Sequence, residues 1–325
     1  MRPVFRIVIN GRQDVTDRFR ERLLSLRVTD EAGRRSDAAE LRLDDRDSAL
    51  ELPPTGREME ISLGYEDRRE TFAGTYVVDE VELSGPPQTL AVRAKAADMH
   101  SSLKAQRTRS WDDVSLGGLV SSIAAEHGLE ARVGSALRTV RIPHLDQTEE
   151  SDLHLLTRLA RDHDAVAKPA GGFLLFVPRG DAASATGQPM PVVDVRPEDC
   201  RRWSVTIADR EAYRSVRAHW HEPESGERRT ETAGDGEPAW TLRRTWASAS
   251  EAREAARAKL SALERGTVRL SLELSPGNPV AAAEAELRLS GFRDGANGSW
   301  TCSRAVHRLD RSGYSTTVDA ALKGG

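Results

Sequence analysis

Two capped amphipathic helices within residues 115–180 constrain the fold of this chain more than any other feature. Ser115 is a typical N-cap, and apolar residues then recur at helical spacing until Gly128, namely Leu116, Leu119, Val120, Ile123 and Ala124. A second helix begins at Ser151 and Asp152, and its apolar stripe comprises Leu153, Leu155, Leu156, Leu159 and Ala160. The following residues predict a hairpin, with strands Ala165 to Ala167 and Phe173 to Val177 around a turn from Lys168 to Gly172. The segment therefore predicts helix, connection, helix and hairpin.

Short alternating strands dominate the rest of the chain. Between Pro3 and Ala97 they follow one another, as in Met59, Ile61 and Leu63 against polar neighbours, and they suggest a closed or nearly closed barrel. After a linker from Asp181 to Pro191, strands resume. A third helix from about Glu251 to Arg265 is capped by Ser248, stopped by Gly266, and alanine-rich enough to pack closely on a sheet. The fold class is therefore α+β and mainly β.

Composition narrows the function classes. The 325 residues predict two to three compact units. The 47 basic and 51 acidic residues are interspersed and leave a net charge of −4, so no overall field favours nucleic acid. Cys200 and Cys302 are too few for a disulfide framework or a cysteine metal site, which favours synthesis in a reducing cytoplasm. We expect no signal peptide and no membrane-spanning segment.

No short motif for serine hydrolysis, phosphate binding or zinc catalysis occurs in the chain. Glu149 and Glu150 are candidate carboxylates for glycan hydrolysis, which needs two carboxyl groups around one bond, but a solvated loop before a helix explains them better. His219 and His221 share one strand face and could bind zinc or iron if a third ligand came from elsewhere, for which the sequence offers no candidate. We therefore predict no catalytic, cofactor-binding or metal-binding residue.

Other polar and aromatic residues favour structural roles. We expect His307 to pack or hydrogen-bond, and residues Asp162, His163 and Asp164 to end a helix whose negative end suits the histidine. The run from Asp44 to Asp47 lacks the glycine and final glutamate of a calcium loop and predicts a charged turn. The tryptophans lack a basic groove beside them, which favours core packing and subunit interfaces for Trp111, Trp203, Trp220, Trp240, Trp246 and Trp300.

Two separated blocks resemble one family. The first is Gln147-x-x-x-Ser151-Asp152-x-x-x-Leu156-x-Arg158-Leu159-Ala160 with its hairpin. The second runs from Gly298 to Val318 and contains Val306-His307-x-Leu309 and Gly313-Tyr314-x-Thr316-Thr317. Each block alone also suits an ordinary core, but together they resemble the phage late-control protein D family, the baseplate hub of contractile tails, and the hub part of VgrG spike proteins. Where many relatives have an aromatic residue, this chain has Leu155, which a core should tolerate.

The resemblance implies a structural hub and no enzyme. It implies two related β-barrel domains, a first tube-like barrel at 1–105 and a second with one helix at 191–325, separated by a helix-helix-hairpin insertion and linker at 106–190. The expected partners are further copies in a homotrimer, a hexameric inner tube protein, a separate trimeric spike protein, and baseplate wedge or tape-measure proteins, with no membrane and no specific nucleic acid. The expected location is the tail baseplate of a virion or phage-like particle. The alternatives are a tail-associated peptidoglycan hydrolase and a transcription regulator, but no helix-turn-helix supports the latter.

Overall fold

The computed structural model describes residues 1–32, 37–97, 101–180, 190–208 and 213–323. The chain divides into two compact units, each built from separate stretches of sequence. Unit 1 comprises Met1–Met99, Met190–Ser204 and Leu270–Ala320, and unit 2 comprises His100–Pro189, Val205–Arg269 and Ala321–Gly325. The predicted division at 105 and 190 stays a prediction, and the predicted linker at 181–191 lies almost wholly outside the described residues.

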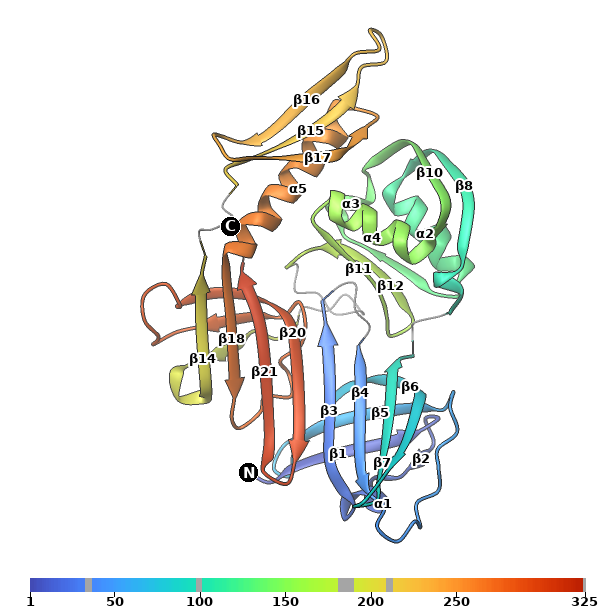
Figure 1. The fold of residues 1–325 in the computed structure, drawn as a ribbon, viewed down its shortest axis with the longest axis vertical. Coiled ribbons are helices and arrows are strands. Elements are labelled where there is room, and N and C mark those ends of the chain that lie inside the picture. Colours follow the sequence, from blue (N-terminus) through green and yellow to red (C-terminus); the bar gives the residue numbers. More distant parts are fainter. Residues whose placement is uncertain (33–36, 98–100, 181–189, 209–212, 324–325) are drawn as a thin grey trace. The chain divides into compact units, whose positions relative to one another are not determined.

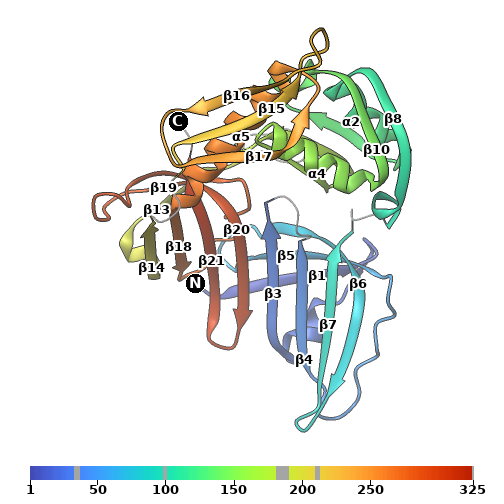
Figure 2. The same cartoon turned by 45° about the horizontal axis from the view of Figure 1, so that its top comes forward.

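Unit 1 is organised around a 13-stranded sheet (Figures 1 and 2). Its main path runs β14-β18-β21-β20-β3-β4-β7-β6-β5-β1-β2, and β19 joins β13 to β20. The strands are β1 (Pro3–Ile9), β2 (Gln13–Asp14), β3 (Leu23–Glu31), β4 (Ala38–Asp44), β5 (Glu58–Tyr65), β6 (Thr71–Ser84), β7 (Thr89–Ala96), β13 (Val193–Val195), β14 (Cys200–Ile207), β18 (Val268–Leu274), β19 (Glu286–Leu289), β20 (Gly298–Asp310) and β21 (Gly313–Leu322). A short helix α1 (Thr16–Arg20) and a 3-10 turn η2 (Pro197–Asp199) connect them.

Alternation of apolar and polar residues builds this sheet as the sequence predicts. In β5, Met59, Ile61 and Leu63 are buried beside half-buried Glu60 and Ser62. The described strands nevertheless form no closed barrel, and the prediction of two separate barrels is not confirmed. The reason lies in the pairing of β3. One edge of β3 pairs with β4, and the other edge, which a barrel of N-terminal strands would need for closure, pairs with β20 from the C-terminal part of the chain.

The first segment of unit 2 contains the two predicted helices. Its elements are η1 (Ser101–Lys104), β8 (Gln106–Ser115), α2 (Leu116–Glu126), β9 (Glu130–Val133), α3 (Ser135–Arg138), β10 (Arg141–Ser151), α4 (Asp152–Asp162), β11 (Ala165–Ala170) and β12 (Phe173–Pro178). Ser115 and Ser151 accept hydrogen bonds from the third backbone N–H beyond them, which confirms both predicted caps. The hairpin turn is shorter than predicted, because β11 continues through Pro169 to Ala170 and only Gly171 and Gly172 remain between the strands.

The second segment of unit 2 is a three-stranded sheet with one helix packed on it. Strands β15 (Ser215–His221), β16 (Arg228–Gly234) and β17 (Ala239–Trp246) lie in the order β16-β15-β17, followed by α5 (Ala249–Thr267). Ser248 caps α5 as predicted, and the buried alanines Ala252, Ala255 and Ala256 let the helix approach the sheet closely. Gly266 does not stop the helix, which continues to Thr267. Among the described residues, no helix is long and apolar enough to cross a membrane.

Candidate functional site

The most buried charged side chain of unit 2 belongs to Asp152, the first residue of α4. Ser151 caps the helix with its hydroxyl, and this leaves the Asp152 carboxylate free to turn inward, where its exposed fraction is 0%. The sequence predicted only that Asp152 would complement the positive end of the helix. The structure instead makes it the centre of a polar network that joins β8, α2, β10 and α4.

Gln147 of β10 fixes one side of this network. Its Oε1 accepts hydrogen bonds from Arg109 Nε at 2.8 Å and Trp111 Nε1 at 3.3 Å. Its Nε2 donates to Asp152 Oδ1 at 2.8 Å and to the backbone oxygen of Glu150 at 2.9 Å. All four interactions of the amide are satisfied, so Gln147 can be fully buried without an energetic penalty for an unpaired polar atom.

Arginines and a histidine surround the Asp152 carboxylate. Arg109 Nη2 lies 2.7 Å from Oδ1, and Arg107 Nε lies 3.5 Å from Oδ2. His127 Nε2 is 2.8 Å from Oδ2. Burial raises the pKa of Asp152, but the hydrogen bonds from Gln147 and His127 and the charges of Arg109 and Arg107 outweigh it and leave the pKa below its usual value. Asp152 is therefore an ionised carboxylate in a buried position.

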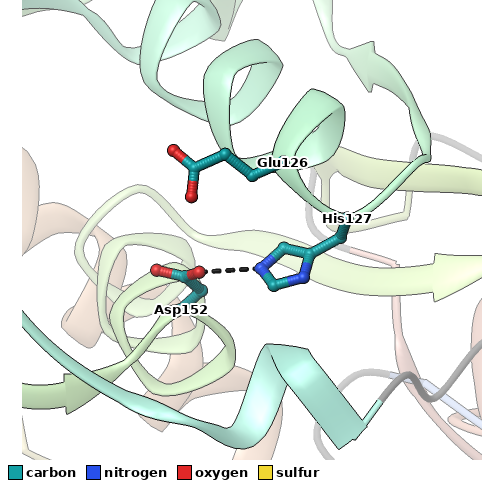
Figure 3. Close-up of side chains that lie close together, drawn as sticks. All are labelled: Glu126, His127 and Asp152. Carbon is teal, nitrogen blue, oxygen red and sulfur yellow. Dashed lines mark hydrogen bonds and ion pairs between the residues drawn. The ribbon is translucent and has the colours of Figure 1, made fainter.

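Glu126 and His127, at the end of α2, complete the network and were missed by sequence reasoning (Figure 3). Arg109 Nη1 binds Glu126 Oε1 at 2.7 Å, and Arg107 binds the other oxygen. His127 Nδ1 shares a hydrogen bond of 2.8 Å with Ser102 Oγ. Nothing in the sequence links these residues to Asp152, because their pairing depends on how the two helices pack.

Glu126, His127 and Asp152 are the one group of possible metal ligands within the described residues, with ligand atoms within 4.8 Å of one another. Two guanidinium groups already bind both carboxylates, so the charges balance without a cation. A divalent ion would have to displace these arginines or lie against them. The donor set therefore fits an ion-pair network better than a metal centre.

The order Ser102, His127, Asp152 also matches the sequence of contacts in a serine hydrolase. The environment differs, because the His127 side chain is only 1% exposed and Asp152 is shared with Gln147 and two arginines. An imidazole so enclosed has little access to a substrate leaving group. The contacts suit a packed core better than a nucleophile.

The candidate carboxylates Glu149 and Glu150 separate in the structure. Glu149 is exposed, as predicted, but it lies within strand β10 and not in a loop. Glu150 lies within β10 with a side chain only 10% exposed, and Arg158 holds both its oxygens at 3.1 and 2.6 Å. The expectation of a solvated loop is therefore wrong for Glu150, because the bulge in β10 turns this residue toward α4.

Residues Asp162, His163 and Asp164 end α4 as predicted, and each also binds the second segment of unit 2. Asp162 pairs with Arg244 at 2.8 Å, and His163 lies 3.2 Å from Glu254. Asp164 pairs with Arg265 through both of its oxygens. The sequence did not show that these residues connect two parts of the unit.

In unit 1, His307 makes the hydrogen bonds that the sequence predicted for it. Its Nε2 donates to the backbone oxygen of Ala281 at 3.0 Å, which makes Nδ1 the acceptor for the Tyr314 hydroxyl at 2.8 Å. Burial lowers the pKa of His307 to about 4, so the imidazole is neutral. Tyr65 donates to the oxygen of Gly277 at 2.8 Å, which fastens the same loop to the sheet.

The remaining residues singled out in the sequence also make contacts within the protein. Asp44 to Asp47 form a charged turn, in which Asp45 Oδ1 accepts from the backbone of Leu50 at 3.1 Å. His219 Nδ1 shares a hydrogen bond with Thr230 at 2.9 Å, and no third metal ligand approaches it within the part of the chain that the structure describes. Trp300 and Trp246 are core residues, whereas Trp203 and Trp240 are 40% and 37% exposed.

Both family-like blocks thus encode buried hydrogen-bond networks, one around Gln147 and Asp152 and the other around His307 and Tyr314. Satisfied networks of this kind specify a unique core and are typical of a structural scaffold. The family model described as phage tail baseplate hub (GPD) matches residues 36–313. The chain belongs to this family, which confirms the predicted resemblance.

Individual relatives agree with this assignment. The chain is 33% identical to the probable baseplate hub protein of Escherichia phage 186, over 99% of this chain and 93% of the relative. Its fold is similar to that of the 43 kDa tail protein of prophage MuSo2 from Shewanella oneidensis, with a TM-score of 0.74, 12% identity and 98% of each chain covered. It is also similar to the E. coli c3393 protein, a type VI secretion component, with a TM-score of 0.56, 10% identity, and 98% of this chain and 77% of that chain covered.

Proposed function

We propose that three copies of this chain form the structural hub of a contractile tail or phage-like injection particle and join a hexameric inner tube to a trimeric spike. The family assignment supports the hub role. The observation that carries the threefold assembly is a pair of edges on the 13-stranded sheet that have no strand partner within the described residues, one on β14 and one on the second half of β6.

Strand β14 ends the main path of the sheet, and almost all its residues are exposed (Figure 1). Trp203, Val205 and Ile207 alternate with polar residues and would normally face a core. Yet Trp203 is 40% exposed and Ile207 is 70% exposed. An apolar stripe on an edge strand favours pairing with another strand.

The second open edge lies on β6. This strand pairs with β5 only from Thr71 to Val77, while its pairing with β7 continues to Ser84. Residues 79–84 therefore have a strand partner on one side only, within the described residues. Leu83 in this stretch is 59% exposed. The carboxylates beside it are paired within the chain, Asp79 with Lys95, and Glu80 and Glu82 with Arg93.

Each edge offers an exposed apolar residue, Ile207 on β14 and Leu83 on β6, beside backbone groups that have no strand partner among the described residues. Contacts between two different surfaces of identical chains close into rings when the rotation allows it. The row between the edges contains β14, β18, β21 and β20 from the C-terminal part and β3, β4, β7 and β6 from the N-terminal part. Three copies would offer six such four-stranded sets to a hexameric tube.

The remaining partners follow from the family and not from particular residues. They are the tube protein, a separate spike protein and wedge or tape-measure proteins, with synthesis in the cytoplasm and assembly into a tail baseplate. The role is structural and not enzymatic. The hydrolase alternative gains little support, because Glu150 is committed to Arg158 and His127 is enclosed.

Replacing Ile207 with lysine tests the edge contact. Association would bury the new lysine at the β14 edge, so the substitution should weaken association between copies at least tenfold, about 1.4 kcal/mol or more. The melting temperature of the single chain should not fall, because Ile207 is 70% exposed there. The matched control is Leu52→Lys, at an exposed apolar position that belongs to neither β14 nor β6. Both variants are coexpressed with the cognate spike and measured by mass photometry. Equal assembly of Ile207→Lys and wild type would rule out this edge.

A further inference from the structure

The sheet β16-β15-β17 has one covered and one open face (Figures 1 and 2). Helix α5 packs on the covered face, where Val216, Ala218 and Trp246 belong to an apolar cluster with the helix alanines. Alternation along β15 turns Arg217, His219 and His221 to the other side. This other side, termed the open face, contains both histidines, and His219 hydrogen-bonds Thr230 there.

Cross-strand partners define the rest of the open face. Arg217 pairs with Thr232 and Thr241, His219 with Thr230 and Thr245, and His221 with Arg228. Directly opposed residues lie on the same side of a sheet. The open face is therefore made of arginine, histidine and threonine.

The open face is positively charged. Arg217 pairs with Glu237 of the adjoining loop, but Arg228 is exposed and has no ion-pair partner among the described residues. Arg243 of β17 lies on the open face, because its neighbour Leu242 packs on the covered side. Arg243 is likewise exposed and unpaired within the described residues. The carboxylate of Glu231 in β16 lies on the covered side, where Arg253 binds it.

The composition favours a protein partner over nucleic acid. The tryptophans of this segment lie on the covered side, with Trp246 in the apolar cluster and Trp240 under Lys259, so the open face lacks a platform for base stacking. Guanidinium groups flanked by hydroxyls are instead well suited to hydrogen-bond carboxylates.

We propose that the open face of this sheet docks a carboxylate-rich surface of a partner protein. The contact uses Arg228 and Arg243 as unpaired cations, with Arg217, the two histidines and the threonines as further donors. It uses residues of β15, β16 and β17 and none of β14 or β6, so it can fail while the threefold assembly stands.

Binding of fluorescein-labelled poly-L-glutamate to the full chain, followed by anisotropy, tests this docking surface. The expected result is salt-sensitive binding that the double variant Arg228→Glu, Arg243→Glu weakens at least tenfold. The matched control is Arg12→Glu, Arg18→Glu, which makes the same charge change at exposed positions of unit 1 and should bind like wild type. Thermal unfolding checks that each variant is folded, and Arg228→Gln, Arg243→Gln serves if charge reversal disturbs folding.

Three outcomes would overturn the proposal. The first is no binding of poly-L-glutamate by the folded wild-type chain. The second is equal weakening by the two double variants, which would indicate a general charge effect. The third is tighter binding of a 20-base-pair DNA duplex than of poly-L-glutamate at equal ionic strength, which would make nucleic acid the better ligand of this face.

Discussion

Replacing Asp152 with alanine is expected to lower the free energy of unfolding by about 3–5 kcal/mol. The substitution leaves Arg109 and His127 facing each other without the carboxylate that binds both. It also removes the acceptor for the buried amide of Gln147. Uncompensated polar groups in a buried position cost far more than a lost surface contact. The measurement is chemical denaturation followed by far-ultraviolet circular dichroism.

The matched control is Asp146→Ala, an exposed aspartate on β10, the strand that leads into α4. Asp146 binds Ser110 and lies near His144, with 62% of its side chain exposed. Surface pairs of this kind are worth about 0–1 kcal/mol. If Asp152→Ala lowers the free energy of unfolding no more than Asp146→Ala does, Asp152 is not the buried, ionised carboxylate at the centre of the network.

Lowering the pH should destabilise unit 1 through His307. Burial lowers the pKa of this histidine from 6.5 to about 4, so between these values the unfolded chain binds a proton that the folded chain does not. The contribution of His307 is therefore complete above pH 6.5 and declines as the pH falls toward 4. The free energy of unfolding should fall by about 1.4 kcal/mol per pH unit in this range, and by about 3 kcal/mol in all.

The His307→Gln variant isolates this contribution. Its unfolding free energy should be lower than that of wild type at pH 7, because Tyr314 and Ala281 lose their imidazole partner. The difference between the two proteins should shrink as the pH falls from 6.5 to 4. A difference that stays constant over this range would mean that His307 titrates normally in the folded chain. The exposed His144 offers a control, because Asp112 and Asp146 raise its pKa and the sign of its effect is opposite.

Local features of the fold were predictable because they depend on neighbouring residues. Ser115, Ser151 and Ser248 cap their helices as the sequence indicates, and the apolar alternation of β5 sets its buried face. The predicted closed or nearly closed barrel is not confirmed, because closure depends on which distant strands meet. The pairing of β3 with β20 joins opposite ends of the chain, and no local pattern records it.

In the candidate site, too, local features were predictable and contacts between distant residues were not. Gln147 and Asp152 were recognised as part of a family-like block, yet their role was not visible, since Arg109 and His127 reach them from other elements. His307 was correctly expected to hydrogen-bond, but its partners come from a loop and a neighbouring strand. Sequence reasoning finds residues whose spacing is informative, and the packing of helices and strands decides what they touch.

In the proposed hub, copies of this chain meet through β14 and the second half of β6. The most direct test replaces Ile207 with the photo-cross-linking residue p-benzoylphenylalanine and irradiates assembled particles. Mass spectrometry should find Ile207-position cross-links to residues 79–84 of another copy, and denaturing gels should show products that stop at three copies of the 35.7 kDa chain. Cross-links that reach only other proteins, or products that exceed three copies, would contradict the proposed hub.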